Sequence, residues 1–297
     1  MEYVIFDLEW DSVFYKAEKR FLNQILQIGA VRLDENFSII GKYEATVKSE
    51  ISKKVTTRFA ELTGITTEKM QSGISFADAV KGFNQFSKGA DVTMTWSDSD
   101  LYTIVENEKL LIGTGLTFEM NGYLDLQKLV QAKMRTRGYE SKNQVSLEAA
   151  AEFFGFDITG FSMHTALDDS SVCAILLKEC YDENVFNSLV KNALKPEFKM
   201  RLHFKPYPIT DINDKSLDKT KFGFLCPKCQ KKLNRVSKWK YRNRWFSAVF
   251  SCSCCSEKFV GRVFAKMTFD GVTYKTRISE LKKKEKSDEM STVPETV

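Results

Sequence analysis

The hydrophobic pattern of the first 47 residues predicts three β-strands. Residues 3–9 (YVIFDLE) begin with an apolar run and end in carboxylates. Residues 25–33 and 37–47 form two further β-like runs, separated by Asp34-Glu35-Asn36, a sequence typical of a tight hairpin turn. The N-terminal part of the chain is therefore expected to begin a sheet.

The following 135 or so residues alternate helical patterns with one more strand. Apolar residues recur at helical spacing in 57–64, 75–88, 99–110, 124–134, 146–154 and 165–181. Residues 91–96 (DVTMTW) are rich in β-branched and apolar side chains, which favours a fourth strand. Three strands followed by alternating helices and strands predict an α/β fold, with a mixed sheet flanked by helices.

The pattern changes after residue 190. Residues 191–221 contain three prolines and no clean period, and we expect them to form a connector. Residues 222–280 alternate short aromatic β-like runs with cysteines, whereas the polar residues 281–297 are expected to be disordered. The predicted domains are thus 1–190 and 222–280.

Acidic residues lie at the end of the first predicted strand and at the starts of two predicted helices. Asp7 and Glu9 share one face of the first strand, because alternate side chains of a strand point the same way. Two adjacent carboxylates repel each other unless a cation lies between them, and a hard divalent ion prefers such oxygen ligands. Further acids start two predicted helices, namely Asp98 and Asp100 in one and Asp168 and Asp169 in the other, shortly after His164.

In order and spacing, Asp7-x-Glu9, Asp100 and His164-x4-Asp169 resemble the DEDDh exonucleases, a superfamily with a ribonuclease-H-like fold. Gln27–Val31 and Leu62–Thr66 also resemble the second strand and the substrate-side segment of this superfamily. The likeness covers about residues 1–185. Trp10 departs from the pattern, since many relatives carry threonine there, in the pocket for the terminal nucleotide.

The resemblance implies a 3′–5′ exonuclease that hydrolyses single-stranded RNA or DNA to 5′-mononucleotides. Asp7, Glu9, Asp100 and Asp169 would hold two Mg²⁺ or Mn²⁺ ions, and His164 would be the general base. Asp169 matches better than Asp168 because the pattern places the acid five positions after the histidine. Asp100 matches better than Asp98 because an apolar helix follows it directly.

The chemistry explains this set of residue types. Two cations about 3.5–4 Å apart stabilise both the attacking water and the departing 3′ oxygen. A histidine, with an ordinary pKa of about 6.5, accepts a proton near neutral pH. Because such a site contacts the phosphate group, which RNA and DNA share, it does not show which of the two is the substrate. The alternative is a non-catalytic nucleic-acid-binding protein on a nuclease fold, for which a lost acid or histidine would be expected; none is lost.

Five of the seven cysteines lie within residues 226–255. Cys226-x2-Cys229 and Cys252-x2-Cys255 have the spacing of two zinc knuckles, which predicts one structural Zn²⁺ in a zinc ribbon. Cys254 remains an alternative ligand within the second knuckle. Cys173 and Cys180 lie seven positions apart on one helical face and are expected to be core residues.

The same region is strongly basic. Residues 221–280 carry 14 Lys/Arg and 3 Asp/Glu, whereas the whole chain has a net charge of +5. An acidic body with a basic appendage is typical of a nuclease with a separate grip for nucleic acid; a merely solvated basic surface would have the same charge.

Basic and aromatic residues alternate between the knuckles, which predicts phosphate contacts and base stacking. The candidates are Lys238, Trp239, Lys240, Tyr241, Arg242, Arg244 and Trp245. Packing of the aromatic residues around zinc is the alternative, and an alternating strand allows both. The expected partner is single-stranded nucleic acid. A protein partner bound through the ribbon is another interpretation, and the resemblance also allows a homodimer.

No run reaches the roughly 18 apolar residues of a membrane span. The first residues, MEYVIFDLEW, lack the basic leader of a signal peptide. The sequence therefore predicts a cytoplasmic protein without a membrane partner.

Overall fold

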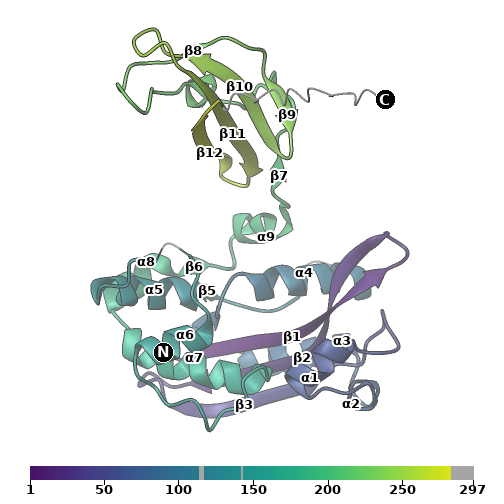
Figure 1. Cartoon of the computed structure of the whole chain (residues 1–297). Helices are drawn as coiled ribbons and strands as arrows, with labels where there is room; N and C mark the ends of the chain where they lie inside the picture. Colours follow the sequence, from purple (N-terminus) through teal and green to yellow (C-terminus); the bar gives the residue numbers. More distant parts are fainter. Residues whose placement is uncertain (114–116, 142, 282–297) are drawn as a thin grey trace, which may run out of the picture. The chain divides into compact units, whose positions relative to one another are not determined.

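Strand β1 (Tyr3–Tyr15) lies inside a six-stranded mixed sheet in the computed structural model, which describes residues 1–113, 117–141 and 143–281 (Figure 1). The strand order is β3-β2-β1-β4-β5-β6, with β1 antiparallel to β2 and parallel to β4. The other strands are β2 (Arg20–Leu33), β3 (Ile39–Thr46), β4 (Val92–Thr95), β5 (Gly122–Asp125) and β6 (Lys191–Asn192). The predicted mixed sheet is confirmed.

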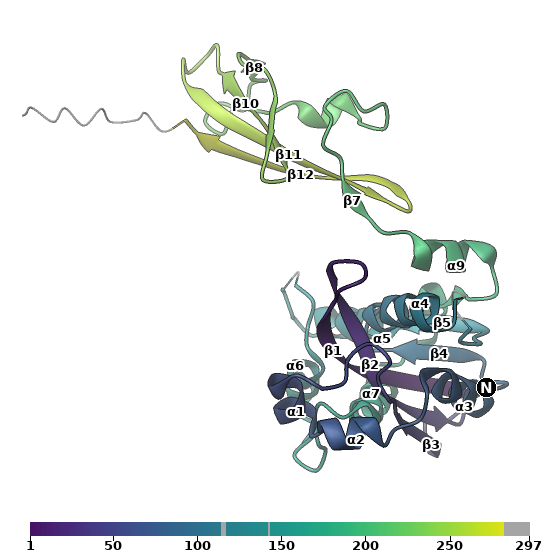
Figure 2. The same ribbon diagram turned by 90° about the vertical axis from the view of Figure 1, so that its right-hand side faces the viewer.

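Helices cover both faces of this sheet (Figure 2). One core lies between the sheet and α3 (Phe76–Ser87), α4 (Ser99–Leu111) and α9 (Pro196–His203). The other core lies against α5 (Leu126–Thr136), α6 (Leu147–Phe153), α7 (Ala166–Cys180) and α8 (Glu183–Leu189). The short helices α1 (Thr57–Thr63) and α2 (Thr67–Gln71) follow β3. Cys173 and Cys180 are buried in the second core, as predicted.

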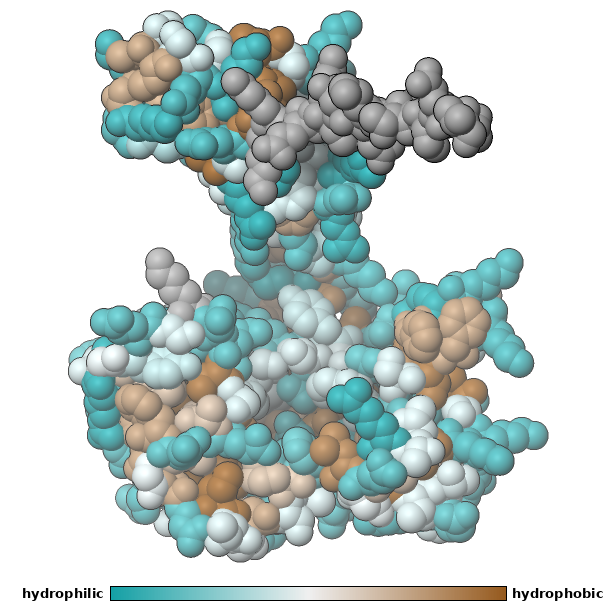
Figure 3. All heavy atoms as spheres, in the orientation of Figure 1, coloured by the Kyte–Doolittle hydropathy of each residue, from teal (hydrophilic) through white to brown (hydrophobic). Residues whose placement is uncertain are grey.

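The strands of the N-terminal hairpin are longer than the hydrophobic pattern predicts. β1 and β2 pair as far as Tyr15 and Arg20, with a register shift between Glu9 and Trp10. Phe14 and Phe21 face each other near the end of the hairpin, with 53% and 68% of their surfaces exposed. Figure 3 shows hydrophobic side chains on the hairpin among hydrophilic ones. Pairing with a neighbouring strand, rather than burial, maintains this extension.

Among the described residues before 191, three elements were not predicted. β5, α2 and α8 are short, with four, five and seven residues, and too brief to show a clear period. Leu124 and Asp125 were expected to start a helix. They belong instead to β5, because this strand pairs in parallel with β4 and α5 begins only at Leu126.

The segment 191–221 is not a continuous connector. The chain divides into two units, Met1–His203 and Phe204–Val297. β6 extends the first sheet, and Phe198 and Leu202 of α9 are buried in the first unit. Ile209 and Leu217 are buried in the second. The sequence did not predict this packing, because the apolar residues of 191–221 are few, show no period and are shared between the two units.

The second unit is an antiparallel sheet of order β12-β11-β10-β8, with β7 paired to β11 and β9 to β10. Its elements are β7 (Tyr207–Pro208), the 3₁₀ helix η1 (Lys219–Phe222), β8 (Asn234–Arg235), β9 (Lys240–Arg242), β10 (Trp245–Ser251), β11 (Lys258–Thr268) and β12 (Gly271–Glu280). Its small core includes Phe246, Phe250 and Phe259. The predicted disordered tail lies outside the described residues, apart from Leu281.

No helix in the described part of the chain has the length and apolar character needed to cross a membrane.

Candidate functional site

Asp7 and Glu9 extend from β1 toward helix α7. They alternate with Phe6 and Leu8, which are buried in the core on the other face of the sheet. Both acids therefore lie on the face that α7 covers, and the register shift follows directly after Glu9.

Helix α7 is held against β2 by polar contacts at its first turn. The backbone N–H of Ala166 donates to the side-chain oxygen of Gln27, at 3.1 Å, and the Ser170 hydroxyl donates to the carbonyl oxygen of Gly29, at 3.0 Å. Gln27 thus caps a helix whose own N-cap residue, Thr165, makes no side-chain capping bond. These contacts bring Asp169 to the acids of β1.

Gly29 allows this close approach. A Cβ atom at residue 29 would lie 2.2 Å from the backbone of Ala166 and Leu167. Gly29→Ala is expected to displace α7, to lower the free energy of unfolding by about 1–3 kcal/mol, and to lower the cleavage rate more than about tenfold by misplacing Asp169. Melting curves and oligonucleotide cleavage measure both effects. Gly160→Ala is the control, because nothing lies within 4 Å of its Cβ; equal effects of both substitutions would contradict the prediction.

Helix α4 brings the fourth acid. Its Asn107 accepts a hydrogen bond from the Ile25 backbone and donates one to Asn23, at 3.2 and 2.8 Å, which ties α4 to β2. Asp100, in the first turn, is only 3% exposed, and the backbone N–H of Leu8 acts against burial by lowering the pKa of its carboxyl group.

Asp98 has different neighbours. Its carboxylate lies 3.4 Å from the Lys128 amine and 3.7 Å from that of Lys191. Lys128 also pairs with Asp125, at 2.5 Å. Of the two acids near the start of α4, Asp100 therefore belongs to the buried group and Asp98 to an ion-pair network.

The acids converge at one place. One carboxylate oxygen from each of Asp7, Glu9 and Asp169 can be chosen so that all three lie within 4.8 Å of one another. Asp100 adjoins this group and is the strongest charged influence on Asp7. One oxygen of Asp100 and one of Asp169 are buried without a hydrogen-bond partner. Asp168 instead accepts a hydrogen bond from Ser162, at 2.8 Å.

The electrostatics of this cluster disfavour negative charge. Burial, followed by the charges of Asp100 and Asp169, raises the pKa of Asp7 well above its ordinary value. The same causes, with Asp169 ahead of Asp100, raise the pKa of Glu9 to about 8. Burial raises the pKa of Asp100 to about 7 and that of Asp169 to about 6. The four groups cannot all be ionised near neutral pH unless positive charge is supplied.

This set fits divalent cations. Carboxylate oxygens of β1 and α7 lie close together beside Asp100 of α4, and two buried oxygens have no hydrogen-bond partner. Hard ions such as Mg²⁺ and Mn²⁺ prefer carboxylate ligands and would remove the repulsion.

His164 lies just before α7 in a left-handed backbone conformation, with φ of 68°. Its backbone N–H favours the ionised form of the Asp169 carboxylate and lowers the pKa of that group, and its imidazole Nε2 lies 3.6 Å from Glu148 of α6. The ring is 43% exposed, so water reaches it. A left-handed conformation of a non-glycine residue costs about 1–3 kcal/mol and often marks a functional site. The sequence did not indicate the contact with Glu148.

Helix α1 is tied to β1 two residues after Glu9. Asp11 accepts hydrogen bonds from the backbone and the hydroxyl of Thr56, at 2.7 and 2.8 Å, and Thr56 caps α1. Leu62 at the end of this helix is 51% exposed. Trp10, partly buried, packs against the first core.

The cysteines of the second unit form another cluster. Sulfur atoms of Cys226, Cys229, Cys252 and Cys255 all lie within 4.8 Å of one another, and none is in a disulfide. Both knuckles have the same backbone: the N–H of the first cysteine donates to the carbonyl five residues on, at 2.8 and 2.9 Å. The residue after each second cysteine, Gln230 or Ser256, has positive φ. Cys254 is exposed and outside the cluster.

This cluster fits a thiophilic cation such as Zn²⁺. A hydrogen bond from the Cys255 backbone lowers the pKa of Cys252 to about 7, whereas the hydrogen bond with Cys229 raises the pKa of Cys255. Ionisation of one cysteine therefore disfavours ionisation of the next. A bound cation would stabilise all four cysteines as thiolates.

The basic and aromatic residues between the knuckles divide between two faces of the sheet. Trp239 packs edge-on against Phe222 and Phe250, and Tyr241 against Phe246, so both contribute to packing. Trp239 and Lys238 line a hollow of about 800 Å³. Lys240, Arg242 and Trp245 lie on the opposite face, and Arg244 lies in the two-residue turn between β9 and β10.

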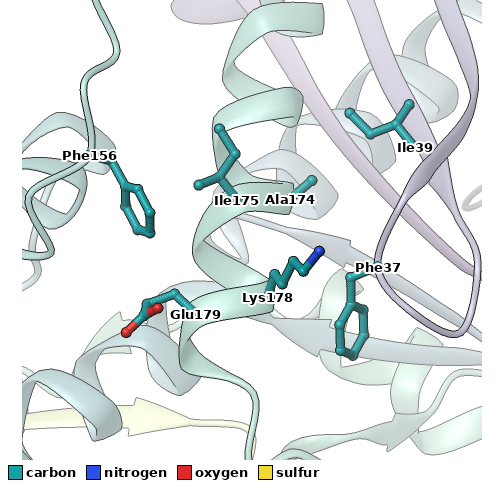
Figure 4. A pocket seen from close by; sticks show the side chains of 7 residues that line it. All are labelled: Phe37, Ile39, Phe156, Ala174, Ile175, Lys178 and Glu179. Atoms are coloured by element: carbon teal, nitrogen blue, oxygen red, sulfur yellow. The ribbon is translucent and has the colours of Figure 1, made fainter.

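A pocket in the first unit lies along the C-terminal half of α7, away from its first turn (Figure 4). It has a volume of about 310 Å³ and is lined by Phe37, Ile39, Phe156, Ala174, Ile175, Lys178 and Glu179. Its one carboxylate, that of Glu179, pairs with Arg137 at 2.7 Å. The pocket therefore lacks the acid cluster of the candidate active site.

Part of this chain is similar to known proteins. Residues 4–177 match the RNase T family, which is described as an exonuclease. The PolC-type DNA polymerase III of Thermotoga petrophila is 27% identical over 185 residues, which is 59% of this chain and 12% of that protein. The protein from Thermotoga maritima is 26% identical over 153 residues, which is 52% of this chain and 10% of that protein. The chain thus spans only about a tenth of the length of these relatives.

Two solved structures resemble the fold. The nuclease domain of 3'hExo, a DEDDh family member bound to rAMP, has a TM-score of 0.52 and 20% identity over 60% of this chain and 90% of that one. Cell-death related nuclease 4 has a TM-score of 0.51 and 19% identity over 64% and 65%. These likenesses show the fold, and the match over residues 4–177, more than half of the chain, shows that the chain belongs to the RNase T family of exonucleases.

Proposed function

We propose that this chain is a 3′–5′ exonuclease that releases 5′-mononucleotides from single-stranded RNA or DNA. The observation that carries the proposal is the convergence of Asp7, Glu9 and Asp169, with oxygens within 4.8 Å, beside the buried Asp100. Asp7, Glu9, Asp100 and Asp169 would hold two Mg²⁺ or Mn²⁺ ions. When bound, the ions would stabilise the negative charge that develops at phosphorus and promote ionisation of water.

The side chains around the acids have separate roles in this proposal. His164 accepts the proton of the attacking water, because its imidazole is exposed to solvent and adjoins the acid cluster through Asp169. Glu148, at 3.6 Å, stabilises the resulting imidazolium and orients the ring. The exposed Leu62 contacts the terminal nucleotide, on a helix that Asp11 ties to β1. The second unit, held by one Zn²⁺ on Cys226, Cys229, Cys252 and Cys255, grips the strand.

Cleavage of end-labelled substrates tests the proposal. Single-stranded RNA and DNA with a 5′ label are incubated with the full chain and Mg²⁺ or Mn²⁺. We expect a ladder that shortens stepwise from the 3′ end, 5′-mononucleotide products, and no ladder with His164→Ala. Intact substrate, with metal binding shown by calorimetry, would favour a non-catalytic nucleic-acid-binding protein. Internal cuts would contradict exonuclease action.

A further inference from the structure

One face of the second sheet packs on the core of the unit, and the opposite face does not. Along β10, Phe246, Ala248 and Phe250 are buried, while Trp245 and the residues that alternate with them stay partly exposed. The same alternation continues in β11, where Val263 and Ala265 are buried and Phe264 is not. We call the side of β9–β12 that carries Trp245 and Phe264 the outer face.

Positive charge gathers on the outer face. The register pairs Arg242 with Trp245, Lys275 with Phe264, and Arg277 with Arg262. The cations of this face are Lys240, Arg242, Lys258, Arg262, Lys266, Lys275 and Arg277, and its strand positions include no aspartate or glutamate. Within the described part of the chain, none of these seven forms an ion pair.

The arrangement is unfavourable for the isolated protein. Arg262 and Arg277 lie directly opposite each other on adjacent strands, and like charges in this position are destabilising. No acid of the face offsets them. A bound polyanion would relieve this repulsion, which is the charge complementarity expected of a nucleic-acid surface.

Two aromatic rings lie among these cations. The ring centroids of Trp245 and Phe264 are 5.7 Å apart, and the Arg277 guanidinium lies 5.1 Å over the Trp245 ring. Beside them is a hollow of about 640 Å³, to which Phe264, Lys266 and Lys275 contribute. Partly exposed rings between cations are typical of surfaces that stack unpaired bases and pair with the backbone.

We propose that the outer face binds a single strand of nucleic acid, with bases stacked on Trp245 and Phe264 and phosphates on the surrounding cations. This deepens the proposed function and rests on it for the substrate class. Unpaired bases are favoured over a duplex, because a duplex hides the faces of its bases within its own stack. Arg262, Phe264, Lys266, Lys275 and Arg277 were not predicted as contacts, because they lie beyond the second knuckle in sequence.

Binding by full-length protein tests the proposal. The Asp7→Asn background prevents cleavage, so fluorescence anisotropy of a labelled strand of 20 thymidines or uridines reports binding alone. We expect Trp245→Ala to raise Kd about fivefold to fiftyfold, in line with the loss of one stacked base. The double variant Arg262→Ala/Arg277→Ala should lower the slope of log K against log salt by about 0.7 per lost phosphate contact.

Matched controls come from the same unit. Tyr207 is 52% exposed but pairs with Met267, on the side of the sheet that faces the core, and Lys215 and Lys232 are exposed cations outside the outer face. Tyr207→Ala and Lys215→Ala/Lys232→Ala should bind nearly as well as the background. Bound zinc and circular dichroism show that each variant is folded.

Unchanged binding by folded Trp245→Ala, equal losses in the controls, or equal affinity for a duplex would overturn the proposal. Cleavage of a four-nucleotide strand by the unmutated protein separates the two proposals. If the unmutated protein cleaves the four-nucleotide strand while Trp245→Ala binds the long strand normally, only the outer-face proposal fails. If the unmutated protein does not cleave the four-nucleotide strand while binding of the long strand still depends on Trp245, only the proposed nuclease function fails.

Discussion

Replacement of Asp7 by asparagine is expected to stop cleavage and, at the same time, to make the metal-free protein more resistant to heat. Asp7→Asn would remove one of the four carboxylates proposed to hold the cations, and we expect the rate to fall at least about 10³-fold, or about 4 kcal/mol in activation free energy.

The gain in stability follows from the sign of the pKa shift. Burial and the neighbouring acids raise the pKa of Asp7 in the folded protein, so its charged form disfavours folding above the unfolded pKa. Asparagine removes this charge and keeps an oxygen that accepts a hydrogen bond. The melting temperature without divalent metal should therefore rise at pH 8, and the gain should shrink as pH falls toward the ordinary pKa of aspartate.

Asp168→Asn is the matched control for this experiment. Asp168 neighbours Asp169 in sequence but accepts a hydrogen bond from Ser162, which asparagine can also do. Cleavage by this variant should stay within a few-fold of the unmutated rate. A loss as large as that of Asp7→Asn would mean that Asp168, and not Asp169, is the acid of the site.

The second large effect concerns the cysteine cluster. Cys252→Ser is expected to unfold the second unit and leave the first unit folded. A structural zinc site in a small domain contributes about 10–16 kcal/mol to folding, which exceeds the stability that a core of this size provides. The two units have separate cores, so loss of one does not remove the packing of the other.

Zinc content, near-ultraviolet circular dichroism and limited proteolysis measure this outcome. We expect about one zinc per unmutated chain, none in Cys252→Ser, and proteolysis confined to residues after 203. Cys254→Ser should keep its zinc, since Cys254 is exposed and outside the cluster. If Cys252→Ser kept its zinc and Cys254→Ser lost it, Cys254 and not Cys252 would be the zinc ligand.

The long elements of the first unit were predictable because their patterns are local. A strand that starts Tyr3-Val4-Ile5-Phe6 and a fifteen-residue helix α7 bury enough apolar side chains to show their period. β5 was missed because four residues show no period, and its structure depends on pairing with β4, which lies far away in sequence. The division of 191–221 between two units has the same cause.

The site shows the same contrast. The spacing of the acids and the histidine sufficed to name Asp7, Glu9, Asp100, His164 and Asp169 by resemblance. The partners of Asp98 and Asp168 became visible only when α5 and the loop before α7 were in place. Gln27, Gly29 and Asn107 do not carry chemistry, and their part in holding α7 and α4 to β2 has no local signal.

By itself, the sequence determined the class of fold, the acids and cysteines able to hold metals, and the basic character of residues 221–280. Tertiary structure alone decided which partners Asp98 and Asp168 take outside the cluster and which ring lies on the outer face. The reason is physical: adjacent side chains have the same local preferences, but strand register and helix docking turn one toward a buried site and the other away.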